Sequence, residues 1–142
     1  MINSKQYITD NAVKLRGFGS QGKENSRRGD EFMRELIANT TQHPFNNRAR
    51  IIGNAHVELF HDGDGVTIKD IQSHEQGSGA GTRALQYLVK LSDKHKVPLN
   101  LYAKGYASTK TSQLKNWYKK HGFEPDDDGA QEMTRKPRYN VE

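Results

Sequence analysis

The segment that decides the fold is Gln76-Gly77-Ser78-Gly79-Ala80-Gly81-Thr82. Glycines at alternate positions leave several backbone N–H groups with no side chain in front of them. The loop follows an alternating, strand-like run and precedes a run with apolar residues at helical spacing. Because a helix N-terminus carries about half a positive charge, this order of strand, loop and helix predicts a binding site for a pyrophosphate.

Two familiar phosphate motifs fit this loop poorly. A Walker A loop needs Lys and then Ser or Thr after its last glycine, whereas here Thr82 and Arg83 follow that glycine. Residues 79–84 satisfy the dinucleotide pattern Gly-x-Gly-x-x-Gly/Ala, which also requires an acidic residue about 20 positions later. No acidic residue stands between Asp93 and Glu124. The sequence therefore argues against a Walker A nucleotide site and against a nicotinamide site.

The strand before the loop belongs to a predicted β-hairpin. Apolar and polar residues alternate over 55–60, residues 61–65 form a turn rich in Asp and Gly, and residues 66–73 return as the second strand. In this second strand the alternation slips by one position between Ile68 and Ile71. Such a slip predicts a β-bulge, in which one extra residue is inserted into one strand of a pair.

Downstream of the loop the pattern predicts two more pairs of elements. We expect a helix over 81–96, a strand over 99–104, a helix over 111–121 and a final strand over 131–136. Gly122 stands where a C-cap glycine would end the second of these helices.

Upstream of the hairpin the signals are weaker. Residues 17–29 are rich in glycine and polar residues and predict a mobile loop. Asp30 then caps a short predicted helix whose apolar residues fall within 32–37, Asn39 ends it, and residues 40–48 are expected to form another loop. The chain of 142 residues fits one domain, and the order of its elements predicts a mixed α/β fold.

Composition limits the chemistry and the partners. The chain has no cysteine, which excludes disulfides, thiolate metal sites and a cysteine nucleophile, so any group that the protein transfers should pass directly from donor to acceptor. The net charge of +5 and the pI of about 9.4 favour anionic partners. No run approaches the roughly 20 apolar residues of a membrane span, and the N-terminus lacks the apolar segment of a secretory signal. We therefore expect a cytoplasmic protein with no membrane partner.

Two segments resemble signatures of the GNAT superfamily of acetyl-CoA-dependent N-acetyltransferases. Residues 76–81 are similar to its Q/R-x-x-G-x-G/A loop, and residues 117–124, Trp-Tyr-Lys-Lys-His-Gly-Phe-Glu, are similar to its aromatic–Tyr–polar–Lys–x–Gly–Phe ending. Residues 133–137 resemble the final strand of that family. The resemblance covers about residues 51–137, and residues 1–50 diverge. It implies a GNAT-like fold: a central mixed, mostly antiparallel sheet with a bulged, splayed central strand and flanking helices.

The resemblance also implies which residues form the site. Acetyl-CoA would be the co-substrate, with its pantetheine arm between the strands predicted at 66–73 and 99–104. Backbone groups around Ile71 would bind that arm, and Tyr118 would be the general acid that protonates the departing thiolate. Thr111 stands where the family often has an asparagine that touches the cofactor. The implied cofactor-binding residues are Ile71, Gln76, Gly77, Ser78, Gly79, Ala80, Gly81, Thr82 and Thr111.

An amine acceptor needs a base, because a lysine amine has a pKa of about 10.4 and must lose a proton before it attacks a thioester. Glu58 and His56 share one face of the strand that precedes the bulged one. Asp70 and His74 flank the predicted bulge. Each of these four side chains can act as a general base, directly or through a water. We rank Glu58 first among them.

The identity of the acceptor stays open at this stage. Seven lysines and no acidic residue occur between Lys94 and Phe123. This lysine-rich segment suits the 3′-phosphate of the cofactor, a solvated surface or a nucleic acid. The alternatives are an acetyltransferase for protein lysines, N-termini or small amines, one whose acceptor is a nucleic acid or aminoacyl-tRNA, and a basic nucleic-acid-binding module without catalysis. We expect a monomer or a homodimer.

Metal binding is not expected from the sequence. The six histidines show no HExxH or other ligand spacing. The run from Asp62 to Gly65 is similar to the start of a calcium loop, but position 12 counted from Asp62 is Ser73 rather than Glu. A hairpin turn is the simpler interpretation.

Overall fold

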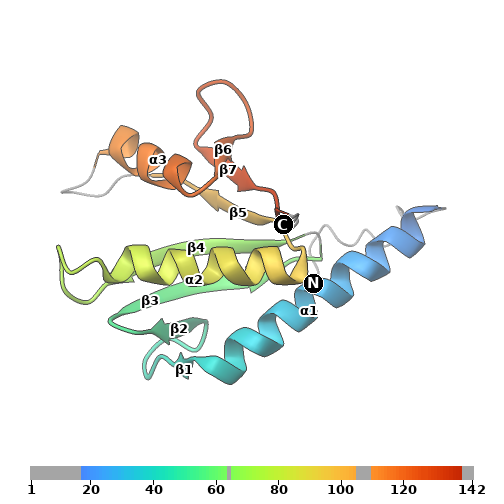
Figure 1. Cartoon of the computed structure of the whole chain (residues 1–142), viewed down its shortest axis with the longest axis horizontal. Coiled ribbons are helices and arrows are strands. Elements are labelled where there is room, and N and C mark those ends of the chain that lie inside the picture. The colour runs from blue at the N-terminus through green and yellow to red at the C-terminus, as the bar shows by residue number, and fades with distance from the viewer. Residues whose placement is uncertain (1–16, 64, 105–109, 139–142) are drawn as a thin grey trace.

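The computed structural model of the chain describes residues 17–63, 65–104 and 110–138 (Figure 1). Its helices are α1 (Gly17–Asn39), α2 (Ala80–His95) and α3 (Thr111–Lys120). Its strands are β1 (Thr41–Gln42), β2 (Ala49–Ile52), β3 (Ala55–His61), β4 (Val66–Ser73), β5 (Leu99–Tyr102), β6 (Glu124–Pro125) and β7 (Glu132–Arg135). Within the described ranges, none of the helices has both the length and the apolar character that crossing a bilayer requires.

The strands form one mixed, mostly antiparallel sheet. Its strand order is β1-β2-β3-β4-β5-β7-β6, and only the neighbours β4 and β5 are parallel. Helix α2 makes the crossover that a parallel pair requires. The predicted mixed α/β class with a mostly antiparallel sheet is confirmed.

The predicted hairpin and its bulge are both present. In the register between β3 and β4, Glu58 pairs with Asp70 while Leu59 pairs with Ile68. Lys69 is therefore the extra residue of a β-bulge. The slip in alternation between Ile68 and Ile71 predicted this position from the sequence.

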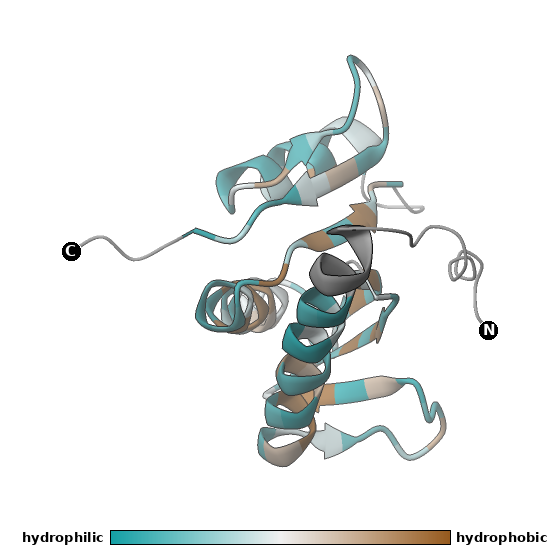
Figure 2. Cartoon of the chain, turned by 90° about the vertical axis from the view of Figure 1, so that its right-hand side faces the viewer, coloured by the Kyte–Doolittle hydropathy of each residue, from teal (hydrophilic) through white to brown (hydrophobic). Residues whose placement is uncertain are grey.

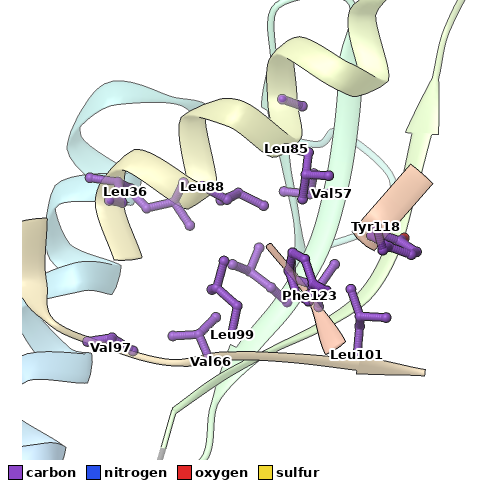
Figure 3. Close-up of a cluster of buried hydrophobic side chains, with 14 of the residues drawn as sticks. Leu36, Val57, Val66, Leu85, Leu88, Val97, Leu99, Leu101, Tyr118 and Phe123 are labelled. Carbon is purple, nitrogen blue, oxygen red and sulfur yellow. The ribbon is translucent and has the colours of Figure 1, made fainter. Parts of the chain in front are cut away.

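Apolar side chains on one face of the sheet form the core with the helices. Val57 of β3, Val66 of β4 and Leu99 of β5 are fully buried. Leu85 and Leu88 of α2 pack onto this face (Figure 3). Helix α1 contacts α2 and covers the same face beside it (Figure 2).

Helix α1 covers residues 17–29, so the mobile loop predicted there is wrong, and the helix does not begin at Asp30. The polar run that suggested a loop instead supplies ion pairs one helical turn apart. Arg27 contacts Glu24 at 2.6 Å and Glu31 at 2.9 Å. Pairs at this spacing each stabilise a helix by roughly 0.2–0.5 kcal/mol.

Gly29 has a packing role that its sequence context did not indicate. It is buried, and a Cβ built on it would lie 2.0 Å from Nε2 of His61, at the end of β3. The His61 ring, itself only 12% exposed, has its Nδ1 3.3 Å from a carboxylate oxygen of Asp30. The glycine therefore allows α1 to approach the sheet closely.

The remaining boundaries differ little from prediction. Helix α2 begins at Ala80, one residue before the predicted start, and β5 ends at Tyr102 rather than at residue 104. Part of the loop predicted over 40–48 forms the short strand β1, which pairs with β2.

The substitution Gly29→Ala tests the close contact between α1 and β3. We expect the free energy of unfolding to fall by about 1–3 kcal/mol, the usual cost of overpacking, although alanine alone would favour the helix by up to about 1 kcal/mol. Urea unfolding measures the change. In a His61→Ala background the ring is gone, and the same substitution should be neutral or stabilising. An equal loss in both backgrounds would contradict the contact.

Candidate functional site

A cavity of about 380 Å³ lies between β4 and β5. Its walls come from the second half of β4, the start of the glycine loop, β5 with the residues after it, and α3. The lining residues are Ile68, Lys69, Asp70, Ile71, Gln72, Ser73, Gln76, Leu101, Tyr102, Lys104, Leu114, Trp117 and Tyr118.

The cavity exists because the sheet splits at the bulge. The parallel pairing of β4 with β5 ends at Ile68 and Leu101. Beyond this point β4 continues along β3 as far as Ser73. Strand β5 instead follows β7, and the N–H of Ala103 donates to Gln131 O at 2.7 Å. The two strands therefore separate, and their facing edges border the cavity.

The cavity meets both faces of the sheet. Ile68 and Leu101 are buried on the face that the helices cover. Asp70, Gln72 and Tyr102 fall on the opposite face, which we call the open face, because paired strand residues share a face and alternate along each strand. Gln72 and Tyr102 are exposed. A molecule held between β4 and β5 is therefore accessible from the open face.

The glycine loop ends at the N-terminus of α2, directly after β4. Gly77 and Gly79 have φ angles of 80° and 82°, which only glycine adopts readily. Gly79 is the N-cap of α2 and has no side chain to cap this end, and the first turn contains no acidic residue. Ser78 Oγ accepts a hydrogen bond from the Ala80 N–H at 3.3 Å. Within the described part of the chain the N–H groups of Gly81 and Thr82 have no hydrogen-bond acceptor. The helix end is therefore suited to an anion.

Arg83 adds positive charge beside this loop. Its guanidinium donates to Ser78 O at 3.2 Å, and the side chain is exposed. A Cβ built on Gly79 would lie 3.1 Å from the Nη1 of Arg83. Loop and guanidinium therefore fit closely, and the sequence had singled out Arg83 only as a departure from the Walker A motif.

Tyr118 is held in the cavity wall by the way α3 ends. Gly122 has a φ of 96°, its N–H donates to Lys119 O at 3.0 Å, and the N–H of Phe123 donates to Tyr118 O at 3.2 Å. These two bonds make a Schellman motif, which confirms the predicted C-cap glycine. The Tyr118 and Phe123 rings pack edge to face with centroids 5.5 Å apart (Figure 3). Tyr118 is only 7% exposed.

Two contacts fix α3 relative to the rest of the site. Trp117 Nε1 donates to Thr82 Oγ1 at 3.1 Å, which joins α3 to the first turn of α2. Arg135 of β7, 3% exposed, donates Nε to His121 O at 2.9 Å and makes a bidentate pair with Asp93 of α2 at 2.8 and 3.2 Å. Burial works to raise the pKa of Asp93, but hydrogen bonds from Arg135 and from the Arg138 backbone outweigh it and keep the pKa below its ordinary value.

The four candidate bases gather on the open face. Glu58 lies opposite Asp70 in the register, and its carboxylate accepts a hydrogen bond from Asn46 Nδ2 at 3.3 Å. His56 lies opposite Gln72, and its Nδ1 is 3.0 Å from Nε2 of His74. Asp70 lines the cavity, whereas Glu58, His56 and His74 stand beside it.

Some of the predicted cofactor-binding residues lie together at the cavity, and others lie outside its lining. Ile71 and Gln76 line the same cavity as Tyr118, and the rest of the loop follows directly from Gln76. Thr111 is the first residue of α3 and is absent from the cavity lining. Thr82 Oγ1 accepts the hydrogen bond from Trp117, and the Thr82 hydroxyl can still donate its hydrogen to a further acceptor.

The sequence analysis did not identify several of the residues that line the cavity. Lys69 is the bulge residue itself and Gln72 follows it in β4, and the predicted slip in alternation was the signal that could have found them. Leu114 and Trp117 were counted only as the apolar stripe of a helix or as part of a motif. In the described residues, no group of three or more histidine or acidic side chains is arranged to hold a metal ion.

Comparison with known proteins supports the fold. No protein-family model and no curated protein matches the sequence. Among solved structures, the chain is similar to the anti-CRISPR protein AcrVA5, with a TM-score of 0.52 and 21% identity over 59% of this chain and 92% of that one. It is also similar to a chain of a KacTA–DNA complex, with a TM-score of 0.43 and 16% identity over 62% of this chain and 65% of that one. The chain has a GNAT-like fold, in which helices flank a mostly antiparallel sheet.

Proposed function

We propose that the chain is an N-acetyltransferase that transfers the acetyl group of acetyl-CoA directly to an amine. The observation that carries this proposal is the cavity between β4 and β5, which joins the glycine loop to Tyr118. A cavity of about 380 Å³ lies within the range of small-molecule sites. The lack of cysteine in the chain is consistent with direct transfer.

The loop from Gln76 to Thr82 would bind the pyrophosphate of acetyl-CoA. The N–H groups of Gly81 and Thr82 at the N-terminus of α2 and the Arg83 guanidinium supply donors and positive charge there. The pantetheine arm would enter the gap, where no ladder joins β4 to β5 beyond Ile68. A backbone N–H near Ile71 would stabilise the oxyanion, an effect worth about 3 kcal/mol in other enzymes.

Tyr118 would donate a proton or a hydrogen bond to the leaving thiolate. Its position in the cavity wall, with a ring held between Trp117 and Phe123, supports this role. A phenol has a pKa near 10 and a thiol near 8.5, so complete proton transfer is uphill by roughly 2 kcal/mol. Tyr118 therefore acts mainly by stabilising charge as it develops on sulfur.

The amine would approach from the open face, where Glu58 and Asp70 lie opposite each other. Two carboxylates beside the gap attract an ammonium group, which suits a protein lysine, an N-terminus or a small amine. Glu58 is the base that the sequence analysis ranked first. The acceptor is defined only as an amine that these two carboxylates attract.

The nucleic-acid alternative loses support from the positions of several lysines. Lys94 pairs with Glu35 at 2.9 Å, Lys96 donates to Asp93 O at 2.9 Å, and Lys104 lines the cavity. Fewer cations of the lysine-rich segment are therefore left for a phosphate backbone. Strong, salt-sensitive binding of DNA or RNA without acetyl-CoA turnover would favour this alternative over catalysis.

Tyr118→Phe tests the proposed acid. We expect kcat for acetyl transfer to fall by about 10²-fold or more, with unchanged affinity for acetyl-CoA, because only the phenolic hydroxyl is lost. Free coenzyme A can be followed with a thiol reagent, since the chain itself has no thiol. Tyr87→Phe is the matched control, because Tyr87 lies on α2 outside the cavity lining. Turnover that is equal in both variants would contradict the assignment.

Gly79→Ala tests the loop. The φ of 82° and the 3.1 Å approach to Arg83 mean that a Cβ would strain the loop and displace the guanidinium. We expect the Kd for coenzyme A, measured by calorimetry, to rise by about tenfold or more. Gly129→Ala is a matched control, with a φ of 74° and no atom within 4 Å of its Cβ. It should leave the Kd unchanged, and equal effects would argue against a cofactor loop.

A further inference from the structure

A pair of histidines stands beside the cavity on the open face. His56 of β3 lies opposite Gln72, which lines the cavity, so their side chains are neighbours on that face. His74 follows β4 directly, and its N–H donates to Asn54 O at 2.9 Å. The two imidazoles approach to 3.0 Å between His56 Nδ1 and His74 Nε2. The rings are therefore held in place by strand pairing on both sides of the hairpin.

A contact of this length between two neutral imidazoles requires one N–H and one lone pair. If His56 Nδ1 carries the proton, it donates to His74, and His56 Nε2 then has a free lone pair. The ring of His43 packs edge-on against His56 with centroids 4.8 Å apart. His43 Nδ1 accepts the Phe45 N–H at 3.1 Å, so the neutral His43 ring carries its proton on Nε2.

The surroundings of His56 keep it unprotonated near neutral pH. Burial lowers its pKa most, and the neighbouring His43 and His74 lower it further. Asp70 and Glu58 act in the opposite direction, and the net pKa is below the ordinary value of 6.5. His56 is half-buried, whereas His74 is exposed to water. A proton that enters at His56 therefore has a route outward through His74.

We propose that the His56–His74 pair is the proton acceptor for an ammonium substrate on the open face. His56 Nε2 takes a proton from the ammonium while the Nδ1 proton of His56 moves to Nε2 of His74, which releases it to water. His56 is the catalytic residue, and His74 is a positioning residue that acts through it. This assignment rests on the proposed N-acetyltransferase function and displaces Glu58 as base.

The protons and bonds of the transfer balance with this pair. The first proton leaves the ammonium through His56 and His74. The free amine then forms the new C–N bond to the thioester carbonyl, and the C–S bond breaks. The attacking nitrogen loses a second proton to water, and the leaving sulfur, stabilised by a hydrogen bond from Tyr118, gains one proton from water. The net products are an amide, coenzyme A as the thiol and one proton.

The carboxylates are better suited to attracting the ammonium than to deprotonating it. Asp70 accepts from Gln72 Nε2 at 2.7 Å, and Glu58 accepts from Asn46 at 3.3 Å. An ordinary carboxylate lies about six pKa units below a lysine amine and an ordinary imidazole about four units below it, a difference that the lowered pKa of His56 reduces. Proton transfer to the histidine pair is therefore the less uphill of the two.

The activity arm of the test compares His56→Gln and His74→Gln with the wild-type chain. Acetyl-CoA is supplied with a lysine peptide, a peptide with a free α-amine, or spermidine, and thiol release is followed against pH. We expect His56→Gln to lower kcat by about 10²-fold and to remove the acidic limb of the pH profile. His74→Gln should shift that limb and lower kcat by about tenfold, with unchanged KM for acetyl-CoA. His95→Gln is the control, because His95 pairs with Glu35 beneath α1.

A second arm needs no activity. Long-range ¹H–¹⁵N NMR of the histidines should find the His56 proton on Nδ1, and His74→Gln should change the titration of His56. A proton on Nε2 of His56, independent titration of the two rings, or full activity of His56→Gln would overturn the relay alone. A wild-type chain that neither binds nor consumes acetyl-CoA would overturn the relay together with the proposed function.

Discussion

The parallel ladder between β4 and β5 ends at Ile68 and Leu101, and the candidate site depends on this ending. Lys69, the residue after Ile68, is the extra residue of the bulge in β4. At the bulge β4 bends and stays paired with β3, whereas β5 continues along β7. The split exposes strand edges that a continuous sheet would pair, and the cavity lies between them. A sheet with regular pairing at this position would leave no cavity between the two strands.

Side-chain contacts fix α3 and β7 relative to α2 beside the cavity. Trp117 joins α3 to the first turn of α2 through Thr82, and Arg135 joins β7 to α2 and to the end of α3. Tyr118 therefore keeps a fixed position relative to the glycine loop, although 36 residues separate it from Thr82 along the chain. Such preorganisation of donors around a reacting centre is what transition-state stabilisation requires.

Local patterns predicted much of this arrangement from the sequence. The slip in alternation between Ile68 and Ile71 predicted the bulge, the alternate glycines predicted the loop, and Gly122 predicted the end of α3. These three features could be predicted because each depends on a few neighbouring residues. The helix over residues 17–29 was missed because a run of glycine and polar residues is also typical of a loop, and the contact that explains Gly29 is with His61, 32 residues away.

The contact between His56 and His74 could not be predicted from the residues that neighbour each of them in the sequence. His56 and His74 meet because the hairpin register, shifted by the bulge, brings their strands into place. From the sequence, Glu58 and His56 shared one face of a strand, Asp70 and His74 flanked the predicted bulge, and Glu58 was ranked first. The 3.0 Å contact between the two rings distinguishes the pair from the two carboxylates, because Glu58 and Asp70 are partly buried just as His56 is.

Hydrogen exchange of the whole chain with and without acetyl-CoA tests the central claim most directly. The account predicts slower exchange of backbone amides in residues 69–73 and 76–82 when acetyl-CoA is present, because these amides border the gap and the N-terminus of α2. Protection confined to other segments would contradict it. So would unchanged exchange up to about 1 mM acetyl-CoA, the upper end of ordinary KM values.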